Sequence, residues 1–263
     1  MPESSAPLRG RDIETLRLTR GEIDLINALD PENYDKLRER APQMAIDAGV
    51  GLDSEQIWFN QVPSSAIPAY KKAWFASTRF RQAISQSINR NDLARVAFRG
   101  YARPAGGWIS PANKVWFNDK LQPHRFDPGS ALGLLRQDGG SGAGSIRLNI
   151  VTLDFPSLIE RIARTFNYEA CLLGFVNDDL DPNSQMNVWV SSAENHQWNP
   201  GEKVAATAWE AEIDRLMLAQ ASTFDFKKRK QAVDRVQQIV WEQEPFIYLV
   251  NKEALSAVFY ERA

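Results

Sequence analysis

The residues with the clearest chemical potential are aspartates that follow an apolar segment. The loop 177–182 holds Asp178, Asp179 and Asp181, and the nearly all-apolar segment 168–176 precedes it directly. Ligands of open α/β sheets bind beyond the carboxyl ends of the strands, so this loop is a predicted binding position. Its carboxylates could pair with a cationic group or hold calcium, although their spacing is not that of the helix–loop–helix calcium motif. The alternative is an ordinary turn, in which Asp181 and the following proline cap a helix.

Other residue types that carry out catalysis are scarce and far apart in the sequence. The two histidines, His124 and His196, lie in polar segments distant from Cys171. No nucleophile elbow, zinc-binding helix or phosphate-binding loop is present. The sequence therefore predicts no catalytic residue, no metal site and no cofactor, and we do not expect an enzyme. A hydrolase with a divalent metal on the three aspartates is a minor alternative, which predicts a bound ion.

Composition indicates an ordinary globular protein with a substantial core. Of the 263 residues, 43% are hydrophobic and 24% are charged, with a formal net charge of −2. Acidic and basic residues are mixed along the chain, which argues against a nucleic-acid partner. The single cysteine stands in an apolar run, so a buried and unreactive thiol is expected. No apolar stretch approaches the roughly 20 residues that span a bilayer, and no signal peptide is expected in this chain.

Alternating signals for helices and strands predict an α/β fold with at least part of its sheet parallel. The apolar segment 168–176 is the predicted central strand, buried on both faces. Thr207 and Glu210 form a capping box, and Asp127 and Asp225 resemble helix N-caps. The other predicted strands cover residues 22–27, 56–60, 146–150 and 246–250, and helices are predicted over 31–40, 80–88, 91–99, 127–135, 156–162, 207–217 and 225–240.

Residues 139–145 interrupt this pattern. They consist only of Gly, Ser and Ala, which is typical of a flexible linker. An engineered join that marks a deletion is the favoured interpretation, because natural loops usually include Asn, Asp or Pro. A natural glycine loop is the alternative. In either case we expect an exposed connection from a helix ending near Gln137 to a strand beginning near Ile146.

Six short motifs along residues 20–258 match, in order, the patterns of one protein family. One motif joins Arg81-Gln82-Ala83 to Asn89-Arg90, and another is the segment 168–182. The others lie at 20–24, 58–60, 127–135 and 245–250. Together they resemble the extracellular solute-binding protein family 5, which includes oligopeptide and dipeptide receptors. The resemblance implies an α/β, periplasmic-binding-protein-like lobe of type II, with a mixed β-sheet flanked by helices.

The resemblance also suggests a division of the chain. Family members are about twice this long and have two lobes. By that comparison residues 1–52 would be a remnant of lobe one and the hinge, 53–249 the ligand-binding lobe two, and 250–263 a return toward lobe one. The crossovers between lobes would fall near 50–55 and 247–251. We therefore expect a trimmed second lobe.

The function that the resemblance implies is solute capture for an ABC importer. Two lobes close around an extended peptide or similar solute and deliver it to a membrane permease in the periplasm or outside the cell. Asp178 would bind the ligand amine, with Phe175 beside it, and Leu172 stands where some members carry a basic residue. The remaining predicted ligand-binding residues are Asp53, Gln56, Asn177 and Tyr248. We expect a monomer, and the alternative is an engineered scaffold derived from such a protein that binds no ligand.

Overall fold

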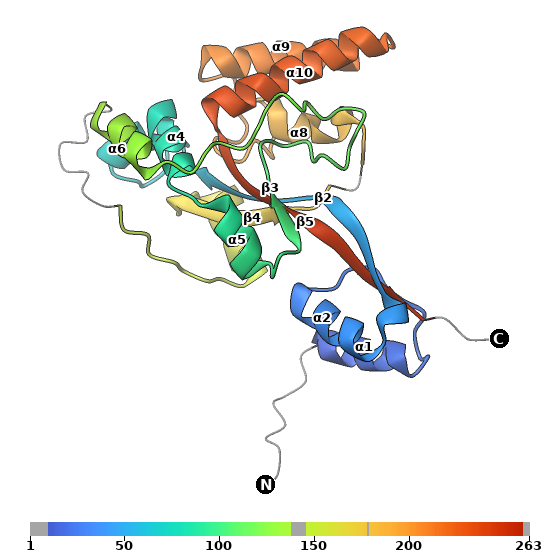
Figure 1. The fold of residues 1–263 in the computed structure, drawn as a ribbon. Coiled ribbons are helices and arrows are strands. Elements are labelled where there is room, and N and C mark those ends of the chain that lie inside the picture. Colours follow the sequence, from blue (N-terminus) through green and yellow to red (C-terminus); the bar gives the residue numbers. More distant parts are fainter. Residues whose placement is uncertain (1–9, 138–145, 178, 260–263) are drawn as a thin grey trace.

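Two long antiparallel strands form the axis of the molecule (Figure 1). The structure is a computed structural model that describes residues 10–137, 146–177 and 179–259. Strands β2 (Ala45–Phe59) and β5 (Phe246–Val258) pair along most of their length. The sheet runs in the order β1-β5-β2-β4, and β3 also pairs with β5. The shorter strands are β1 (Leu25–Ile26), β3 (Ala102–Pro104) and β4 (Ala170–Phe175).

The direction of the strands corrects one expectation. The α/β class with helices flanking a sheet is confirmed, but every strand pair in the described residues is antiparallel. Alternation along the chain predicted parallel pairs because helices often connect them. Here β2 pairs with β4 and β5, which come from far downstream, and the long segments in between return the chain in the opposite direction. Parallel pairing would need a crossover that carries the chain back to the same end of the sheet.

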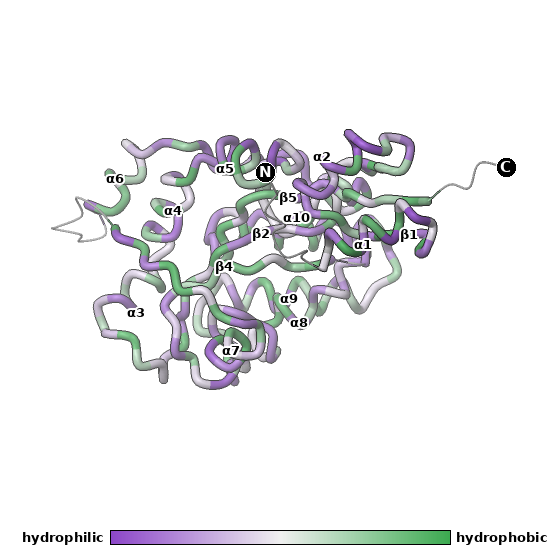
Figure 2. Tube along the Cα trace, turned by 90° about the horizontal axis from the view of Figure 1, so that it is seen from below, coloured by the Kyte–Doolittle hydropathy of each residue, from purple (hydrophilic) through white to green (hydrophobic). Residues whose placement is uncertain are grey.

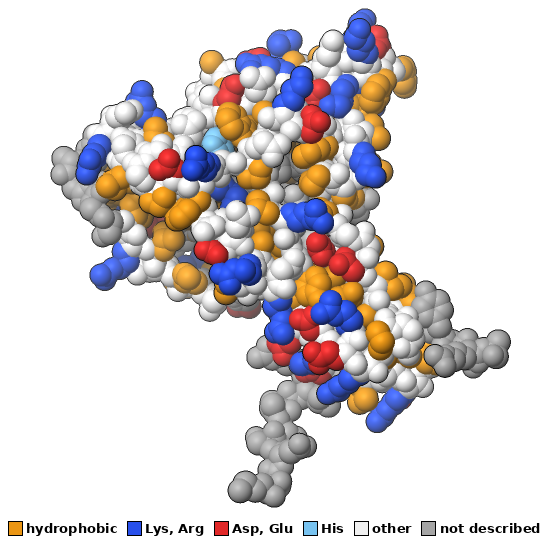
Figure 3. Space-filling view, in the orientation of Figure 1, with side chains coloured by type: hydrophobic (Ala, Val, Ile, Leu, Met, Phe, Trp, Pro, Cys, Tyr) orange, Lys and Arg blue, Asp and Glu red, His pale blue; other side chains and the backbone are white. Residues whose placement is uncertain are grey.

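A small helical unit lies at one end of β2 and β5 (Figure 1). It contains α1 (Gly10–Thr19), β1, α2 (Pro31–Arg40) and the 3₁₀ turn Pro42–Met44. Helix α2 begins where Asp30 Oδ1 accepts a 2.9 Å hydrogen bond from the backbone N–H of Asn33. The unit has its own core. Figure 3 shows a narrowed waist between this unit and the main body, with acidic and basic side chains interspersed over the visible face. The core residues of the unit are Leu18, Ile26, Leu29, Tyr34, Leu37, Ala41, Leu255 and Ala257.

Helices cover both faces of the sheet in the main body. On one face, Phe59, Ile247 and Leu249 pack against Phe75 and Phe80. The helices nearest this face are α3 (Ala69–Ala76), α4 (Thr78–Gln86), α5 (Arg90–Ala97) and α6 (Pro128–Gln137). The other face has the larger core, rich in tryptophan. It is covered by α7 (Phe155–Ile159), the π-helical segment Glu160–Thr165, α8 (Met186–Trp189), α9 (Ala208–Ala221) and α10 (Phe226–Gln243).

Most predicted helices are confirmed because their caps are local. The Glu210 backbone N–H donates to Thr207 Oγ1 at 3.2 Å at the start of α9, and Asp225 accepts from the Lys228 N–H at the start of α10. Helix α6 ends at Gln137 as expected. Helix α5 begins at Arg90, one residue before the predicted range, since Asn89 is its N-cap. No helix within the described ranges is both long enough and apolar enough to cross a bilayer.

Two predicted strands differ in the structure. Strand β4 is largely hydrophobic (Figure 2), yet it lies at the edge of the sheet and Leu172 is 61% exposed. An apolar run is compatible with a central strand, but only tertiary pairing decides whether a neighbour covers each side. Residues 146–154 form no hydrogen-bonded strand, and Ile150 is 89% exposed, because no described strand lies alongside them. The predicted linker 139–145 lies outside the described residues.

Candidate functional site

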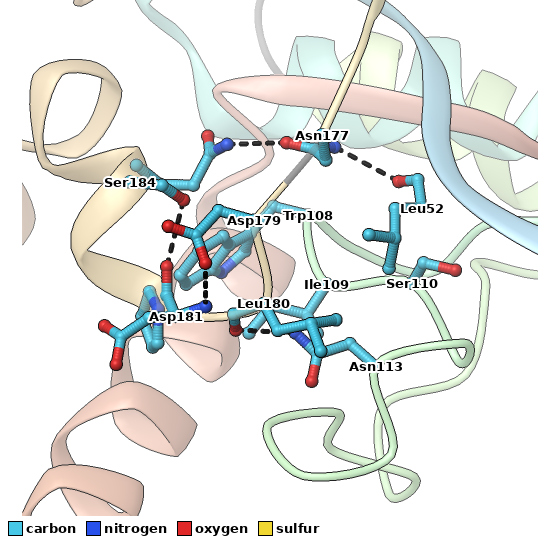
Figure 4. Close-up of a pocket in the computed structure, with 12 residues that line it drawn as sticks. Leu52, Trp108, Ile109, Ser110, Asn113, Asn177, Asp179, Leu180, Asp181 and Ser184 are labelled. Atoms are coloured by element: carbon cyan, nitrogen blue, oxygen red, sulfur yellow. Dashed lines mark hydrogen bonds between the residues drawn. The ribbon is translucent and has the colours of Figure 1, made fainter.

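A small open hollow lies where the chain leaves β4 (Figure 4). One wall is the segment after β4 together with the 3₁₀ turn Pro182–Gln185. The other wall is the loop that contains Trp108 and Asn113, with Leu52 of β2 at the rim. The lining residues are Leu52, Trp108, Ile109, Ser110, Asn113, Asn177, Asp179, Leu180, Asp181, Pro182, Ser184 and Gln185.

Asn177 attaches the first wall to the sheet. Its backbone N–H donates to Asp53 Oδ1 at 3.2 Å, and its side-chain Nδ2 donates to the carbonyl oxygen of Leu52 at 3.1 Å. Gln185 Nε2 in turn donates to Asn177 Oδ1 at 2.5 Å. The predicted residues Asp53 and Asn177 therefore lie together at the edge of the hollow. Their mutual hydrogen bond holds the chain in a defined position just before the acidic loop.

The second wall comes from a loop that the sequence analysis did not assign to the site. Ser110 Oγ donates to the Gly51 carbonyl at 2.6 Å, and Asn113 Nδ2 donates to the Leu180 carbonyl at 2.9 Å. The Trp108 side chain is buried and its indole Nε1–H has no hydrogen-bond partner. A buried donor without a partner is costly, and a ligand or a water can satisfy it. The signal in the sequence was a tryptophan within a loop rich in glycine and proline.

The described aspartates of the acidic loop have different roles. Asp179 Oδ1 accepts from the Asp181 backbone N–H at 2.9 Å. Asp181 accepts from the Asn183 N–H at 2.9 Å, and it caps the 3₁₀ turn as predicted. It also binds Arg229 Nη2 at 2.7 Å, a partner that the sequence analysis missed. The hydrogen bond from Arg229 is the main cause that lowers the pKa of Asp181. Asp178 lies outside the described residues, so its role stays a prediction.

Replacement of Asp181 should lower stability modestly. Asp181→Ala removes both the cap and the ion pair with Arg229, and we expect a loss of about 1–2 kcal/mol in the free energy of unfolding. Asp181→Asn keeps a capping oxygen and should cost less. Since the folded-state pKa lies below the ordinary value of 3.8, the stabilisation is present above that pH and disappears as the pH falls through the folded pKa. Urea unfolding of both variants measures this. Equal losses in the two variants would contradict the capping role.

Three other predicted site residues share one face of the sheet. Gln56 is opposite Leu173 on β4 and Tyr248 on β5, while Phe175 is opposite Ser54. Phe175 stacks on Trp58 with ring centroids 6.1 Å apart. The Gln56 side chain is fully buried, and its Nε2 has no hydrogen-bond partner. Burial raises the pKa of Tyr248 well above its usual value. These residues lie on the face of the sheet that packs against the tryptophan-rich core.

Leu172 does not join that group. It pairs with Ile57 of β2, and directly opposed residues point to the same side of an antiparallel sheet. Because side chains alternate along a strand, Leu172 points to the face opposite Phe175. The seven predicted residues are thus divided: Asp53 and Asn177 at the hollow, Gln56, Phe175 and Tyr248 on one face, Leu172 on the other, and Asp178 outside the described residues.

A second hollow lies beside Tyr248, and its lining includes the ionisable side chains of Arg90, His124 and Glu244. Glu244 Oε1 is 3.2 Å from His124 Nε2, and burial raises the pKa of Glu244 to about 8. Arg90 donates to the carbonyl oxygens of Tyr248 and Ser85. Burial also lowers the pKa of His124. This cluster ties helices to β5, and its hydrogen bonds are structural.

The sequence is similar to a known protein family and to characterised members of it. Residues 11–145 match the model of the family described as bacterial extracellular solute-binding proteins, family 5 Middle. The glutathione-binding protein GsiB of Salmonella paratyphi A is 23% identical over 212 residues, which cover 70% of this chain and 41% of GsiB. These relatives are named for binding solutes, in agreement with the prediction that the chain is not an enzyme.

Solved structures agree in fold. The ABC transporter substrate-binding protein CtaP of Listeria monocytogenes has a TM-score of 0.75 at 19% identity, covering 96% of this chain and 54% of CtaP. DppA of Helicobacter pylori, solved in complex with the peptide STSA, has a TM-score of 0.72 at 18% identity, covering 96% of this chain and 51% of DppA. The chain therefore spans about half the length of these proteins or less. By its sequence and its fold, the chain belongs to the bacterial extracellular solute-binding proteins of family 5.

Proposed function

We propose that this chain forms one wall of a cleft that binds a peptide or a small peptide-like solute for an ABC importer. The observation that carries the proposal is the hollow after β4, where Arg229 neutralises Asp181 but not the two other described carboxylates. Asp179 lines it, Asp53 lies beside it, and within the described residues neither carboxylate forms an ion pair with Lys or Arg. A ligand amine would supply the missing positive charge, and Asp178, between Asn177 and Asp179, is its proposed partner.

The polar groups of the walls suit an extended peptide. Main-chain amides of a peptide need donors and acceptors at the walls of the cleft. The indole N–H of Trp108 is a donor without a partner, whereas the side chains of Asn177 and Asn113 already hydrogen-bond within the protein and hold the walls in place. GsiB is named for binding glutathione, and the DppA structure holds a peptide. Both relatives support a small peptide as the ligand class.

The proposed division of the chain rests on the separate core of the small helical unit and on the irregular pairing of β2 with β5. Residues 1–52 include the small helical unit with its separate core. The pairing of β2 with β5 shifts register between Asp47 and Gln56, and Gly49 has a φ of +82°. Such irregularities lie where strands bend or twist. We propose a hinge here, with the ligand-binding lobe over 53–249 and the return toward lobe one over 250–263.

The remaining proposals concern the cell. The partner would be an ABC permease, the site of action the periplasm or the cell exterior, and the chain itself a monomer in solution. Membership of the family and the relatives' names support the permease and the location. The rival proposal, a scaffold without a ligand, predicts that no peptide binds at all.

Peptide binding by this chain alone should be weak. A cleft protein gains affinity when both walls close on the ligand, and this chain would supply one wall. We expect a Kd no tighter than about 100 µM, or roughly −5.5 kcal/mol, for a short peptide with a free amine. NMR titration of ¹⁵N-labelled protein with the peptide should change the chemical shifts of the Asn177 amide and the Trp108 indole N–H. N-acetylation of the peptide should make these changes smaller.

Two variants distinguish the loss of a ligand contact from a general loss of negative charge in the loop. Asp178→Asn should abolish the shifts by removing a charge-assisted hydrogen bond of about 1.5–3 kcal/mol. Asp181→Asn is the matched control, because its carboxylate already binds Arg229, and it should leave the shifts intact. Micromolar affinity of this single chain would contradict the one-wall proposal. Equal binding of the acetylated peptide would contradict the role of Asp178.

A further inference from the structure

A second set of ligating side chains lies away from the hollow, where the loop after α8 meets α9. His196 and Glu202 lie on the loop and Glu210 lies in the first turn of α9. One ligand atom from each lies within 4.8 Å of the others. His196 and Glu210 are almost fully buried, and Glu202 is 9% exposed. Buried carboxylates need a compensating charge, yet no Lys or Arg in the described ranges forms an ion pair with Glu202 or Glu210.

The histidine presents an unused nitrogen to the two carboxylates. His196 Nδ1 is 2.9 Å from the carbonyl oxygen of Val188. A carbonyl only accepts, so Nδ1 carries the proton, and in the neutral ring Nε2 has the lone pair. Nε2 has no hydrogen-bond partner and is 3.6 Å from Glu210 Oε1, which is longer than a hydrogen bond. With a neutral ring, two electron-rich atoms face each other at this buried position, and a cation between them would stabilise both.

The carboxylates are oriented by further hydrogen bonds. Trp198 Nε1 donates to Glu210 Oε1 at 2.8 Å and Thr207 Oγ1 donates to Glu210 Oε2 at 2.7 Å. Glu202 accepts from the backbone N–H of Ala206 at 2.6 Å and from Asn199 Nδ2. The carbonyl oxygen of Val188 orients the imidazole of His196 in the same way, by accepting from Nδ1. Partners of this kind orient the ligating side chains in metal sites.

We propose that His196, Glu202 and Glu210 bind a divalent zinc-like cation, which fastens the loop after α8 to α9. One imidazole nitrogen with carboxylate oxygens is a ligand set that suits Zn²⁺, whereas Ca²⁺ and Mg²⁺ prefer oxygen alone. Bonds of about 2.0–2.1 Å in a tetrahedral site place ligand atoms roughly 3.3 Å apart, so the three side chains would approach one another by up to about 1.5 Å. A second carboxylate oxygen or a water would supply the fourth ligand.

The test uses the whole chain, stripped with a chelator and then titrated with Zn²⁺ alone. We expect one zinc per chain after desalting, measured by mass spectrometry of the metal. At a hundredfold excess over the Kd, zinc should raise the unfolding midpoint by about 5–10 °C. Glu202→Gln and His196→Gln should each weaken zinc binding at least tenfold. His124→Gln is the matched control, since it changes the other histidine of the chain, and it should bind zinc as the unaltered protein does.

A second measurement needs no variant. Co²⁺ bound to the unaltered protein should show the strong visible absorption of a tetrahedral site, and Zn²⁺ should abolish it. The proposal is overturned if the protein retains no zinc, if both cluster variants bind zinc like the unaltered protein, or if His124→Gln removes the binding. An octahedral Co²⁺ spectrum would also overturn it. Circular dichroism of each variant establishes that it is folded before its zinc content is measured.

Discussion

Arg81→Met should lower the free energy of unfolding by about 3–5 kcal/mol, the largest loss expected of a single substitution that we describe. The Arg81 side chain is almost fully buried and donates to the carbonyl oxygens of Phe75, Gln243 and Glu244, the first at 2.7 Å. It joins α4 to the end of α10. Methionine fills similar space but leaves these carbonyls without a donor, and unpaired buried acceptors are costly.

The matched control for this substitution is on the same helix. Arg79 is exposed, and Arg79→Met should change stability by no more than about 0.5 kcal/mol. Urea unfolding followed by tryptophan fluorescence compares the two. Arg81→Lys should lie between them, because lysine keeps the charge but lacks the planar set of donors. A loss below about 1 kcal/mol for Arg81→Met would contradict the structural role.

Stability should also depend on pH through Glu244. Burial raises its folded-state pKa to about 8, whereas its ordinary value is 4.5. The folded protein therefore holds a proton that the unfolded chain releases. This contribution is fully present below about pH 4.5 and is lost as the pH rises through 8. Between pH 5 and 8 the free energy of unfolding should fall by on the order of 3 kcal/mol from this group alone.

Glu244→Gln should remove most of this decline because the amide does not titrate. Burial lowers the pKa of His124, so that residue acts in the opposite direction and destabilises the fold as the pH falls. Glu242→Gln, two residues earlier and nearer to solvent, is the control and should keep the pH dependence. Urea unfolding at pH 5, 6, 7 and 8 measures all three proteins. A decline of equal size in Glu244→Gln would show that another group is responsible.

The first prediction concerns a motif that pointed to the family. Arg81 and Arg90 belong to one of the six motifs, and the structure shows that both donate to backbone carbonyls inside the main body. That motif is therefore informative about the fold and says nothing of the ligand. The acidic loop is different, since Asn177 and Asp179 lie at the hollow.

The sequence by itself determined the local features. Helix caps such as Asp225 and Thr207, and the cap at Asp181, were predictable because each joins a side chain to a backbone N–H two or three residues away. The family was recognisable from motifs in order, and it carried the α/β class with it. Candidate residues at the hollow, Asp53 and Asn177, came from the same resemblance.

Only the tertiary structure decided how distant segments pair. The antiparallel directions, the edge position of β4 and the placement of Leu172 on the face away from Phe175 depend on register between strands. The wall that contains Trp108 and the ion pair of Arg229 with Asp181 join segments far apart in the sequence. A periodic pattern reports which side chains are apolar. It carries no information on which strand lies alongside, because that choice depends on the packing energy of the whole core.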